Sequence, residues 1–409
     1  MYKKTKYNIL MVSDYPLAEV MGGAIRVLYE QSSRLANKGH SVHILTREEH
    51  SNEGYSKICG IKEWKYEVDN RNSIRFAKST LTNSRKLFDS ITDRYSFDHI
   101  IFYQPFSAYG ILSSKKSNNV NKIYSCFSFS FEEFKSRNKR PNRLIRKLIF
   151  EMESLARKKW EEKVLNKSEK VIALSQFTKD KIQDVYSIPQ EKISLIPGGV
   201  DLKRFKPFRD KSAIRNRLKV PTGKIVLFCV RNLVKRMGLE NLISALRIII
   251  KKAPGVILIL GGEGVLKNEL ITLARNADLE NYIYFVGFIP EEQLPDYYGM
   301  ADLFVLPTKE LEGFGLVTIE AMASGLPVVG TSVGGTKEIL GNFDESFLFK
   351  GTDSGSISDL ILEKCQVIKQ NPEKWKSVSN QCRKYVENNY SWGKNIDSLE
   401  ELLAKSFKN

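Results

Sequence analysis

The sequence predicts an α/β protein made of two doubly wound domains, each built on a mostly parallel sheet. Its 409 residues exceed what one ordinary hydrophobic core holds, since domains of about 100–150 residues are the most common. Short apolar runs alternate with amphipathic helical patterns, which is typical of parallel strands joined by helices. The alternation breaks once, at residues 205–224, and then resumes. We therefore expect two domains of the same class.

The first series of elements begins with "YNILMVS" (7–13), a short apolar run that predicts a buried strand. "RVLYEQSSRLANKG" (26–39) then has the apolar spacing of an amphipathic helix. Further strands are predicted at "HSVHILTR" (40–47), "FDHIIFY" (97–103), "NKIYSC" (121–126) and "KVIALS" (170–175).

The break at 205–224, "FKPFRDKSAIRNRLKVPTGK", is polar and basic and contains Pro207 and Pro221, so it predicts a linker with a small helix. A new buried strand follows directly at "KIVLFCV" (224–230). The second series continues with "GVILILGGEG" (255–264), "YIYFVGF" (282–288), "ADLFVLPT" (301–308) and "LPVVGTS" (326–332).

The composition narrows the partners. The net charge is +17, and most of the excess lies before residue 206, which favours an anionic partner such as a phosphate-bearing substrate, an acidic lipid surface or a nucleic acid. Nucleic acid is disfavoured, because neither an RNP-like aromatic strand nor a zinc module is present. The five cysteines are scattered without a CxxC pair, which suits a reducing cytoplasm. No apolar run approaches the ~20 residues of a membrane span.

Residues 140–170 predict one long basic helix with apolar residues on a single face. These apolar positions are 144, 145, 148, 149, 152 and 155. The favoured interpretation is that this stripe packs on the first domain. The alternative is that the helix rests on an anionic membrane surface, with residues 135–170 as the contact region.

The segment "EGFGLVTIEAMASGLPVVG" (312–330) carries the strongest chemical signal. Gly313 and Gly315 permit a tight turn before a short helix, and the start of a helix is a natural anion site. Glu312 precedes this helix and Glu320 lies little more than one turn inside it. A carboxylate would repel a phosphate, so these two are suited to sugar hydroxyls, which donate hydrogen bonds to carboxylate oxygens. The segment therefore predicts a sugar-nucleotide site.

This segment resembles the donor-site signature of glycosyltransferase family 4, in which two glutamates are separated by seven residues. "MGGAIRVLYEQSSRLANKGHSVHILTR" (21–47) and "VIALSQFTKDKIQDVYSIPQEKISLIPGGVDLKRFKP" (171–207) resemble the family as well. The resemblance implies a GT-B fold, with two Rossmann-like domains that face an interdomain cleft. Residues 1–205 would bind the acceptor and 206–390 the nucleotide sugar. A final helix, 391–409, would cross back to the first domain.

The resemblance also implies a donor site. Glu312 would contact the transferred sugar near its reacting end, and Glu320 would hold the ribose hydroxyls. Backbone N–H groups of Phe314, Gly315 and Leu316 would bind the diphosphate. The other donor-binding positions would be Gly22 and Gly23 in the first domain, Gly262 and Gly264 along the nucleotide, and Phe288 and Ile289 against the base.

Two departures from the family pattern concern catalysis. The family usually presents an Arg and a Lys after the strand that "KIVLFCV" matches, and these cations stabilise the leaving diphosphate. Alignment places Asn232 and Met237 there, whereas Arg231 and Arg236 stand one residue earlier. We expect Arg231 and Arg236 to supply the charge and Asn232 to supply a hydrogen bond.

A histidine that the family often carries over the donor sugar is replaced as well. Phe127, in "YSCFSFSFEEF", falls at its position. Ser128 or Ser130 is then expected to provide the hydrogen bond.

The resemblance implies a retaining glycosyltransferase without a cofactor. A metal is not expected, since the chain has no Asp-x-Asp triplet. A UDP-sugar is the favoured donor and a GDP-sugar the second candidate. The expected acceptor is a glycan or a lipid-linked oligosaccharide of surface polysaccharide synthesis, with the enzyme peripheral to the inner membrane face. The alternatives are a small soluble acceptor, a sugar-nucleotide epimerase or hydrolase, or a non-catalytic binder.

Overall fold

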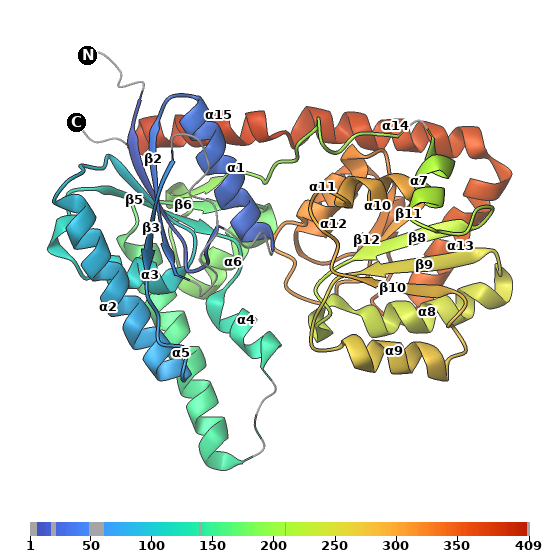
Figure 1. Ribbon diagram of the computed structural model, residues 1–409, viewed down its shortest axis with the longest axis horizontal. Helices are drawn as coiled ribbons and strands as arrows, with labels where there is room; N and C mark the ends of the chain where they lie inside the picture. The colour runs from blue at the N-terminus through green and yellow to red at the C-terminus, as the bar shows by residue number, and fades with distance from the viewer. Residues whose placement is uncertain are drawn as a thin grey trace. The chain divides into compact units, whose positions relative to one another are not determined.

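The computed structural model describes residues 6–17, 22–48, 61–138, 141, 143–208 and 210–406. The chain divides into two compact units, one formed by residues 1–198 with 392–409 and the other by 199–391 (Figure 1). The sequence placed the first division at 205/206 and the second at 390/391. Each unit holds one sheet whose described strands pair in parallel, so the predicted fold class is confirmed.

The first unit contains a seven-stranded sheet in the order β3-β2-β1-β4-β5-β6-β7. Its register places Ile9 opposite Val42 on one side and His99 on the other. The strands are β1 (Asn8–Val12), β2 (Ser41–Arg47), β3 (Ile61–Tyr66), β4 (His99–Phe102), β5 (Asn121–Cys126), β6 (Lys170–Ala173) and β7 (Ile193–Leu195).

Helices cover both faces of this sheet. They are α1 (Gly23–Asn37), α2 (Ser73–Thr92), α3 (Pro105–Ile111), α4 (Ser130–Arg137), α5 (Leu144–Lys167), α6 (Gln176–Tyr186) and α15 (Trp392–Ser406). On one face, Leu10 and Val12 of β1 share a core with Phe88 of α2, Val164 of α5 and Ile182 of α6. Helix α1 contacts β2 and β3, and α15 packs on α1.

The C-terminal helix α15 is joined to the first unit by polar contacts as well. Gln31 donates to the Asn395 side chain at 3.0 Å, and the His40 ring lies 2.8 Å from a Glu400 oxygen. Lys38 forms an ion pair with Glu400 at 2.6 Å. The last helix of the chain therefore completes the domain that the first helix begins.

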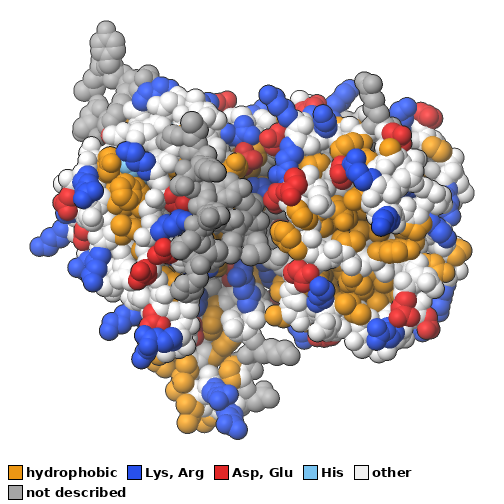
Figure 2. Space-filling model, viewed as in Figure 1, with side chains coloured by type: hydrophobic (Ala, Val, Ile, Leu, Met, Phe, Trp, Pro, Cys, Tyr) orange, Lys and Arg blue, Asp and Glu red, His pale blue; other side chains and the backbone are white. Residues whose placement is uncertain are grey.

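The apolar stripe on α5 does not pack on the first domain. Its six side chains are between 51% and 82% exposed, and hydrophobic side chains gather over the lower end of α5 in Figure 2. The side of α5 that faces the domain instead carries Phe150, Ser154, Glu161 and Val164. The favoured sequence interpretation was therefore wrong, because periodicity identifies a stripe but not what covers it.

The second unit contains a six-stranded sheet in the order β10-β9-β8-β11-β12-β13. Its strands are β8 (Ile225–Val230), β9 (Val256–Gly261), β10 (Ile283–Gly287), β11 (Leu303–Leu306), β12 (Val328–Thr331) and β13 (Leu348–Phe349). The central strands are buried on both faces, as expected for a sheet covered by helices on each side.

The helices of the second unit are α7 (Lys211–Arg217), α8 (Leu239–Lys252), α9 (Lys267–Asn276), α10 (Leu294–Met300), α11 (Leu316–Ala323), α12 (Gly334–Phe343), α13 (Ser354–Gln370) and α14 (Pro372–Asn389). On one face, Leu227 and Cys229 share a core with α8, α9 and α13. On the other, Phe228 and Phe304 pack around Tyr298 of α10.

Both sheets have a topological switch point, where the strand order reverses. It lies between β1 and β4 in the first sheet and between β8 and β11 in the second. Helices leave the two central strands toward opposite faces, so the loops at their carboxyl ends diverge and leave room for a ligand. This rule marks the edge at which residues 231 and 307–315 emerge.

A buried acid stabilises the first unit. Glu161 of α5 accepts hydrogen bonds from the Tyr124 hydroxyl at 2.8 Å, the Tyr186 hydroxyl at 2.6 Å and the Ser130 backbone N–H at 3.1 Å. Burial disfavours its charged form and raises its pKa from the ordinary 4.5 to about 7.

This pKa predicts that stability falls as the pH rises from about 5 to about 7. In that window Glu161 stays protonated in the folded state but ionises in the unfolded chain, so raising the pH favours unfolding by at most about 1.4 kcal/mol per unit. Above about 7 both states are ionised and the slope ends. Urea unfolding across this range should show a flatter profile for Glu161→Gln than for wild type. The exposed neighbour Glu162→Gln is the control, and equal slopes in all three proteins would contradict the prediction.

Candidate functional site

Most of the predicted donor residues lie at the carboxyl edge of the second sheet. They follow β8, β9, β10 and β11, and parallel strands present their carboxyl ends at one edge. The structure brings to this edge Arg231, Asn232, Arg236, Gly262, Gly264, Phe288, Ile289, Glu312, Phe314, Gly315 and Leu316.

An ion pair between Arg231 and Glu312 spans the switch point. Arg231 follows β8 and Glu312 lies in the loop after the adjacent β11, and their side chains are 8% and 10% exposed. The Thr308 hydroxyl donates to the same Glu312 oxygen at 3.3 Å. Glu312 is therefore a buried, partnered carboxylate rather than a solvated loop residue.

Met237 supports the Arg231 guanidinium. Its sulfur lies 3.2 Å from Nε and 2.9 Å from Nη2 of Arg231. Residue 237 is the position at which the family pattern has its lysine. The Arg231 side chain thus reaches from one residue before the usual arginine position to the usual lysine position. The positive charge displaced in the sequence returns to this place in the fold.

Arg236 ties two loops of the edge together. Its Nη1 donates to the Leu311 carbonyl at 2.9 Å, while its own carbonyl accepts from the backbone N–H groups of Lys309 at 2.8 Å and Glu310 at 3.3 Å. These contacts hold the loop that carries Glu312. The structure therefore gives Arg236 a positioning contact, and its predicted contact with phosphate stays a prediction.

Two glycines allow the backbone to close around the ion pair. A Cβ at Gly262 would lie 1.9 Å from the Arg231 carbonyl oxygen, and one at Gly334 would lie 1.9 Å from the Glu312 carbonyl oxygen. Both residues have positive φ, at 119° and 56°. Larger side chains at either position would push the charged residue's backbone out of place.

Glu320 lies on α11 and is 2% exposed. The Tyr298 hydroxyl donates to its Oε2 at 3.0 Å, and the Tyr298 ring is held edge-on by Phe228 and Phe304. A fixed donor thus orients the carboxylate. Helix α11 begins after Gly315, so its first N–H groups lie between Glu312 and Glu320 in the chain.

The remaining residues at this edge differ in exposure. Phe288 is 56% exposed, as a ring available for stacking on a base would be. Ile289 is buried against Gly261, and Asn232 is exposed. Phe314 is buried and meets Tyr390 edge-on at 5.7 Å, so its contribution to an anion site would come from its backbone.

Gly22, Gly23 and Ser128 belong to the first unit. Gly22 is the N-cap of α1, with φ 104°, and Gly23 is the first residue of that helix. The Ser128 hydroxyl donates to Glu133 at 2.7 Å. Phe127, at the expected histidine position, stacks on Tyr103 with ring centroids 5.7 Å apart. These contacts lie within the first unit, and the roles predicted toward a donor stay predictions.

The comparisons with known proteins match both units. Residues 21–204 match the family model described as "Glycosyltransferase Family 4", and residues 210–389 match "Glycosyl transferases group 1". The chain belongs to glycosyltransferase family 4. The two matches together account for nearly all of this family 4 chain.

Named relatives agree with this assignment. The family 4 chain is 28% identical over 246 residues to a GDP-mannose-dependent alpha-(1-6)-phosphatidylinositol monomannoside mannosyltransferase of Mycolicibacterium smegmatis. That match covers 58% of this chain and 63% of the relative, so it spans less than two thirds of the relative's length.

Solved structures show the same fold. Sucrose-phosphate synthase from Thermosynechococcus elongatus superposes with a TM-score of 0.82 at 21% identity, covering 98% of this chain and 99% of that one. Anabaena HepE in complex with UDP and glucose has a TM-score of 0.77 at 19% identity, covering 97% and 99%. The family 4 chain therefore has the GT-B type of fold, with two Rossmann-like domains.

Sequence reasoning missed four residues that build the site. Met237 supports Arg231, Thr308 bonds Glu312, Tyr298 orients Glu320, and Gly334 admits the Glu312 backbone. Gly334 stands within the signature "PVVGTSVGGTKEI" and could have been assigned from it. Nothing in the local pattern singles out the other three, because their roles depend on contacts across loops and helices.

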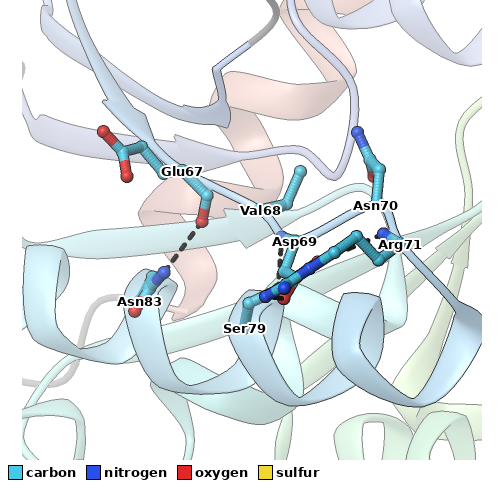
Figure 3. A pocket seen from close by; sticks show the side chains of 7 residues that line it. All are labelled: Glu67, Val68, Asp69, Asn70, Arg71, Ser79 and Asn83. Carbon is cyan, nitrogen blue, oxygen red and sulfur yellow. Dashed lines mark hydrogen bonds and ion pairs between the residues drawn. The ribbon is translucent and has the colours of Figure 1, made fainter.

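A separate pocket of about 550 Å³ lies beside the loop after β3 (Figure 3). Its polar groups engage one another. Arg71 donates to both Asp69 oxygens, at 2.8 and 2.6 Å, and Asn83 donates to the Glu67 carbonyl at 2.9 Å. Its lining shares no residue with the predicted donor site.

Breaking the Arg231–Glu312 pair from one side should destabilise the protein. Arg231→Met would leave a buried carboxylate without its counter-charge, at a cost of about 3 kcal/mol in the free energy of unfolding. The double variant Arg231→Met/Glu312→Gln should recover most of this loss. Urea unfolding of a double-mutant cycle measures the coupling, and additive losses would contradict it. The exposed pair Arg275–Glu280 provides a control in which Arg275→Met leaves stability unchanged.

Proposed function

We propose that the protein is a retaining glycosyltransferase that moves a sugar from a nucleoside-diphosphate sugar to an acceptor hydroxyl. The observation that carries this proposal is the Arg231–Glu312 pair at the switch point, next to the start of α11. A cation, a helix start and two oriented carboxylates together match a donor that is anionic in its middle and rich in hydroxyls at both ends.

Each group has a chemical task in this proposal. Arg231 and the first N–H groups of α11 stabilise the charge that grows on the leaving diphosphate. Glu320 accepts hydrogen bonds from the ribose hydroxyls, and Glu312 accepts them from the transferred sugar. When the donor binds, the diphosphate competes with Glu312 for Arg231. Glu312 is then released toward the sugar.

The reaction proposed here keeps the configuration at the sugar's anomeric carbon. The bond from this carbon to the diphosphate oxygen breaks, and the acceptor oxygen bonds to the carbon on the same face. The acceptor's proton passes to the departing phosphate oxygen. Arginine and the helix start supply the charge stabilisation, so we propose a reaction without a metal or another cofactor.

The donor base and the acceptor complete the proposal. The sequence favours UDP, whereas the mannosyltransferase relative is named for GDP-mannose, which makes GDP-mannose the main competitor. We propose a glycan or lipid-linked acceptor in surface polysaccharide synthesis, with the enzyme at the cytoplasmic face of the membrane. The relative's name, which specifies a phosphatidylinositol mannoside, supports a lipid-linked acceptor.

A thermal-shift screen with UDP, GDP, ADP and their sugars tests donor binding. A nucleotide at about 100 times its Kd should raise the melting temperature by several degrees, because it binds only the folded state. Glu320→Gln keeps an acceptor oxygen for Tyr298 but should lose most of the shift, whereas Glu312→Ala should keep the nucleotide shift and lose sugar transfer. Glu269→Gln, on the exposed side of α9, is the control. A wild-type protein that responds to none of the nucleotides would refute the proposal.

Restoring the family pattern tests the role of Arg231. Arg231→Ala should lower the release of nucleoside diphosphate from the donor at least about 100-fold, as expected for a lost transition-state cation. Adding Asn232→Arg and Met237→Lys to this variant should recover most of the rate, since both then place charge where Arg231 now reaches. Arg247→Ala, on the exposed face of α8, is the control. Wild-type rates in Arg231→Ala, or no recovery in a folded triple variant, would contradict this assignment.

A further inference from the structure

The first half of α5 carries an apolar surface that the described part of the protein does not cover. The stripe consists of Leu144, Ile145, Leu148, Ile149, Met152 and Leu155, each at least half exposed. Exposed apolar residues scattered singly are normal, but a contiguous row on one helix face marks an interaction site. The row occupies more than three turns of one helix.

The stripe projects from the body of the first domain. Figure 1 shows α5 running beyond the strands of the first sheet, and its early turns form the far end. Phe150 alone in these turns is buried, and it packs on Phe134 of α4 at 4.9 Å. This contact secures the opposite side of the helix. The stripe is therefore held on a fixed helix and faces outward.

Positive charge borders the stripe on both sides. At 3.6 residues per turn, Arg146 lies beside one edge of the stripe and Lys147 beside the other. Both are exposed, as is Arg143, and within the described ranges none of the three forms an ion pair. The sequence just before the helix, "KRPNR" (139–143), adds further positive charge.

The acidic residues of these turns are already neutralised. Glu151 pairs with Lys135 of α4 at 3.4 Å, and Glu153 pairs with Arg157 at 3.0 Å. The unmatched charge around the stripe is thus positive. A surface with an apolar centre and a basic rim is complementary to the boundary between anionic lipid headgroups and acyl chains.

We propose that the first half of α5 is a membrane-surface anchor for anionic lipid. The six apolar side chains enter the headgroup–acyl boundary, and Arg143, Arg146 and Lys147 meet lipid phosphates. The inference narrows the predicted region 135–170 to residues 143–155, and it does not depend on the proposed transfer reaction.

The same features disfavour two other occupants. A second copy of the chain, packed stripe to stripe, would bring two basic rims together. A transmembrane role is disfavoured because none of the described helices is long and apolar enough to cross a bilayer. A surface-lying helix satisfies both constraints.

Vesicle sedimentation tests the anchor without donor or acceptor. Wild-type protein should bind phosphatidylcholine vesicles that contain phosphatidylglycerol, and binding should fall with salt and with removal of phosphatidylglycerol. Leu148→Glu/Met152→Glu should reduce partitioning at least about tenfold. Val265→Glu, at an 85% exposed apolar site in the second unit, should bind like wild type.

A charge reversal on the rim separates lipid recognition from apolar adhesion. Arg146→Glu/Lys147→Glu should lose binding to anionic vesicles, whereas Lys251→Glu/Lys252→Glu, the same change at an exposed helix end in the second unit, should retain it. All these side chains are exposed, so circular dichroism and melting temperature should match wild type.

A fluorescent label then locates the stripe in the bilayer. Cys126, Cys229, Cys365 and Cys382 are buried, and Cys59, outside the described residues, is replaced by serine. A polarity-sensitive dye on Leu148→Cys should shift to shorter wavelength with anionic vesicles, and a dye on Val265→Cys should not. The proposal is overturned if wild-type protein ignores anionic vesicles, if the stripe variants bind equally well, or if sedimentation velocity shows a stripe-dependent dimer without lipid binding.

Discussion

The ion pair between Arg231 and Glu312 is the contact on which the candidate site depends. It joins two loops that leave adjacent strands, β8 and β11, at the point where the strand order of the second sheet reverses. A buried pair of charges adds little net stability, because desolvation offsets much of the attraction. Its value here is in specifying one arrangement of two loops that have no regular structure of their own.

Several backbone features serve this arrangement. Arg236 anchors residues 309–311 through three hydrogen bonds, and the close approaches at Gly262 and Gly334 bring neighbouring loops onto the carbonyls of the paired residues. The pair is thus pre-organised before any ligand arrives. Pre-organised charge is what stabilises a developing anion effectively, since no reorganisation is required during the reaction.

Much of this organisation could be predicted from the sequence. Apolar runs bounded by turns located the central strands of both sheets, and the carboxyl-edge rule then placed Arg231 and Glu312 near each other. Helix periodicity and the Gly315 turn located α11 correctly. The edge strand β3 was missed because "IKEWKY" is half exposed and alternates weakly, so it lacks the signal of a buried strand.

Other features could not be predicted, for physical reasons. The direction of the Arg231 side chain depends on the turn after β8 and on the Met237 sulfur, which no local pattern encodes. Tyr298 reaches Glu320 from a different helix, held there by rings of β8 and β11. The stripe on α5 was found by its spacing, but spacing cannot distinguish a face buried by protein from one left open.

The open stripe and the paired charges also differ in what they require of the fold. The donor site needs fixed geometry, and it is built in the second unit from buried side chains at the edge of a fully parallel sheet. The stripe needs only a helix held on its opposite side, and Phe150 on Phe134 supplies that. Because the stripe side chains contribute little to the core, replacing them should leave the fold intact. Selection could therefore change the surface that the first domain meets without disturbing the chemistry of the second.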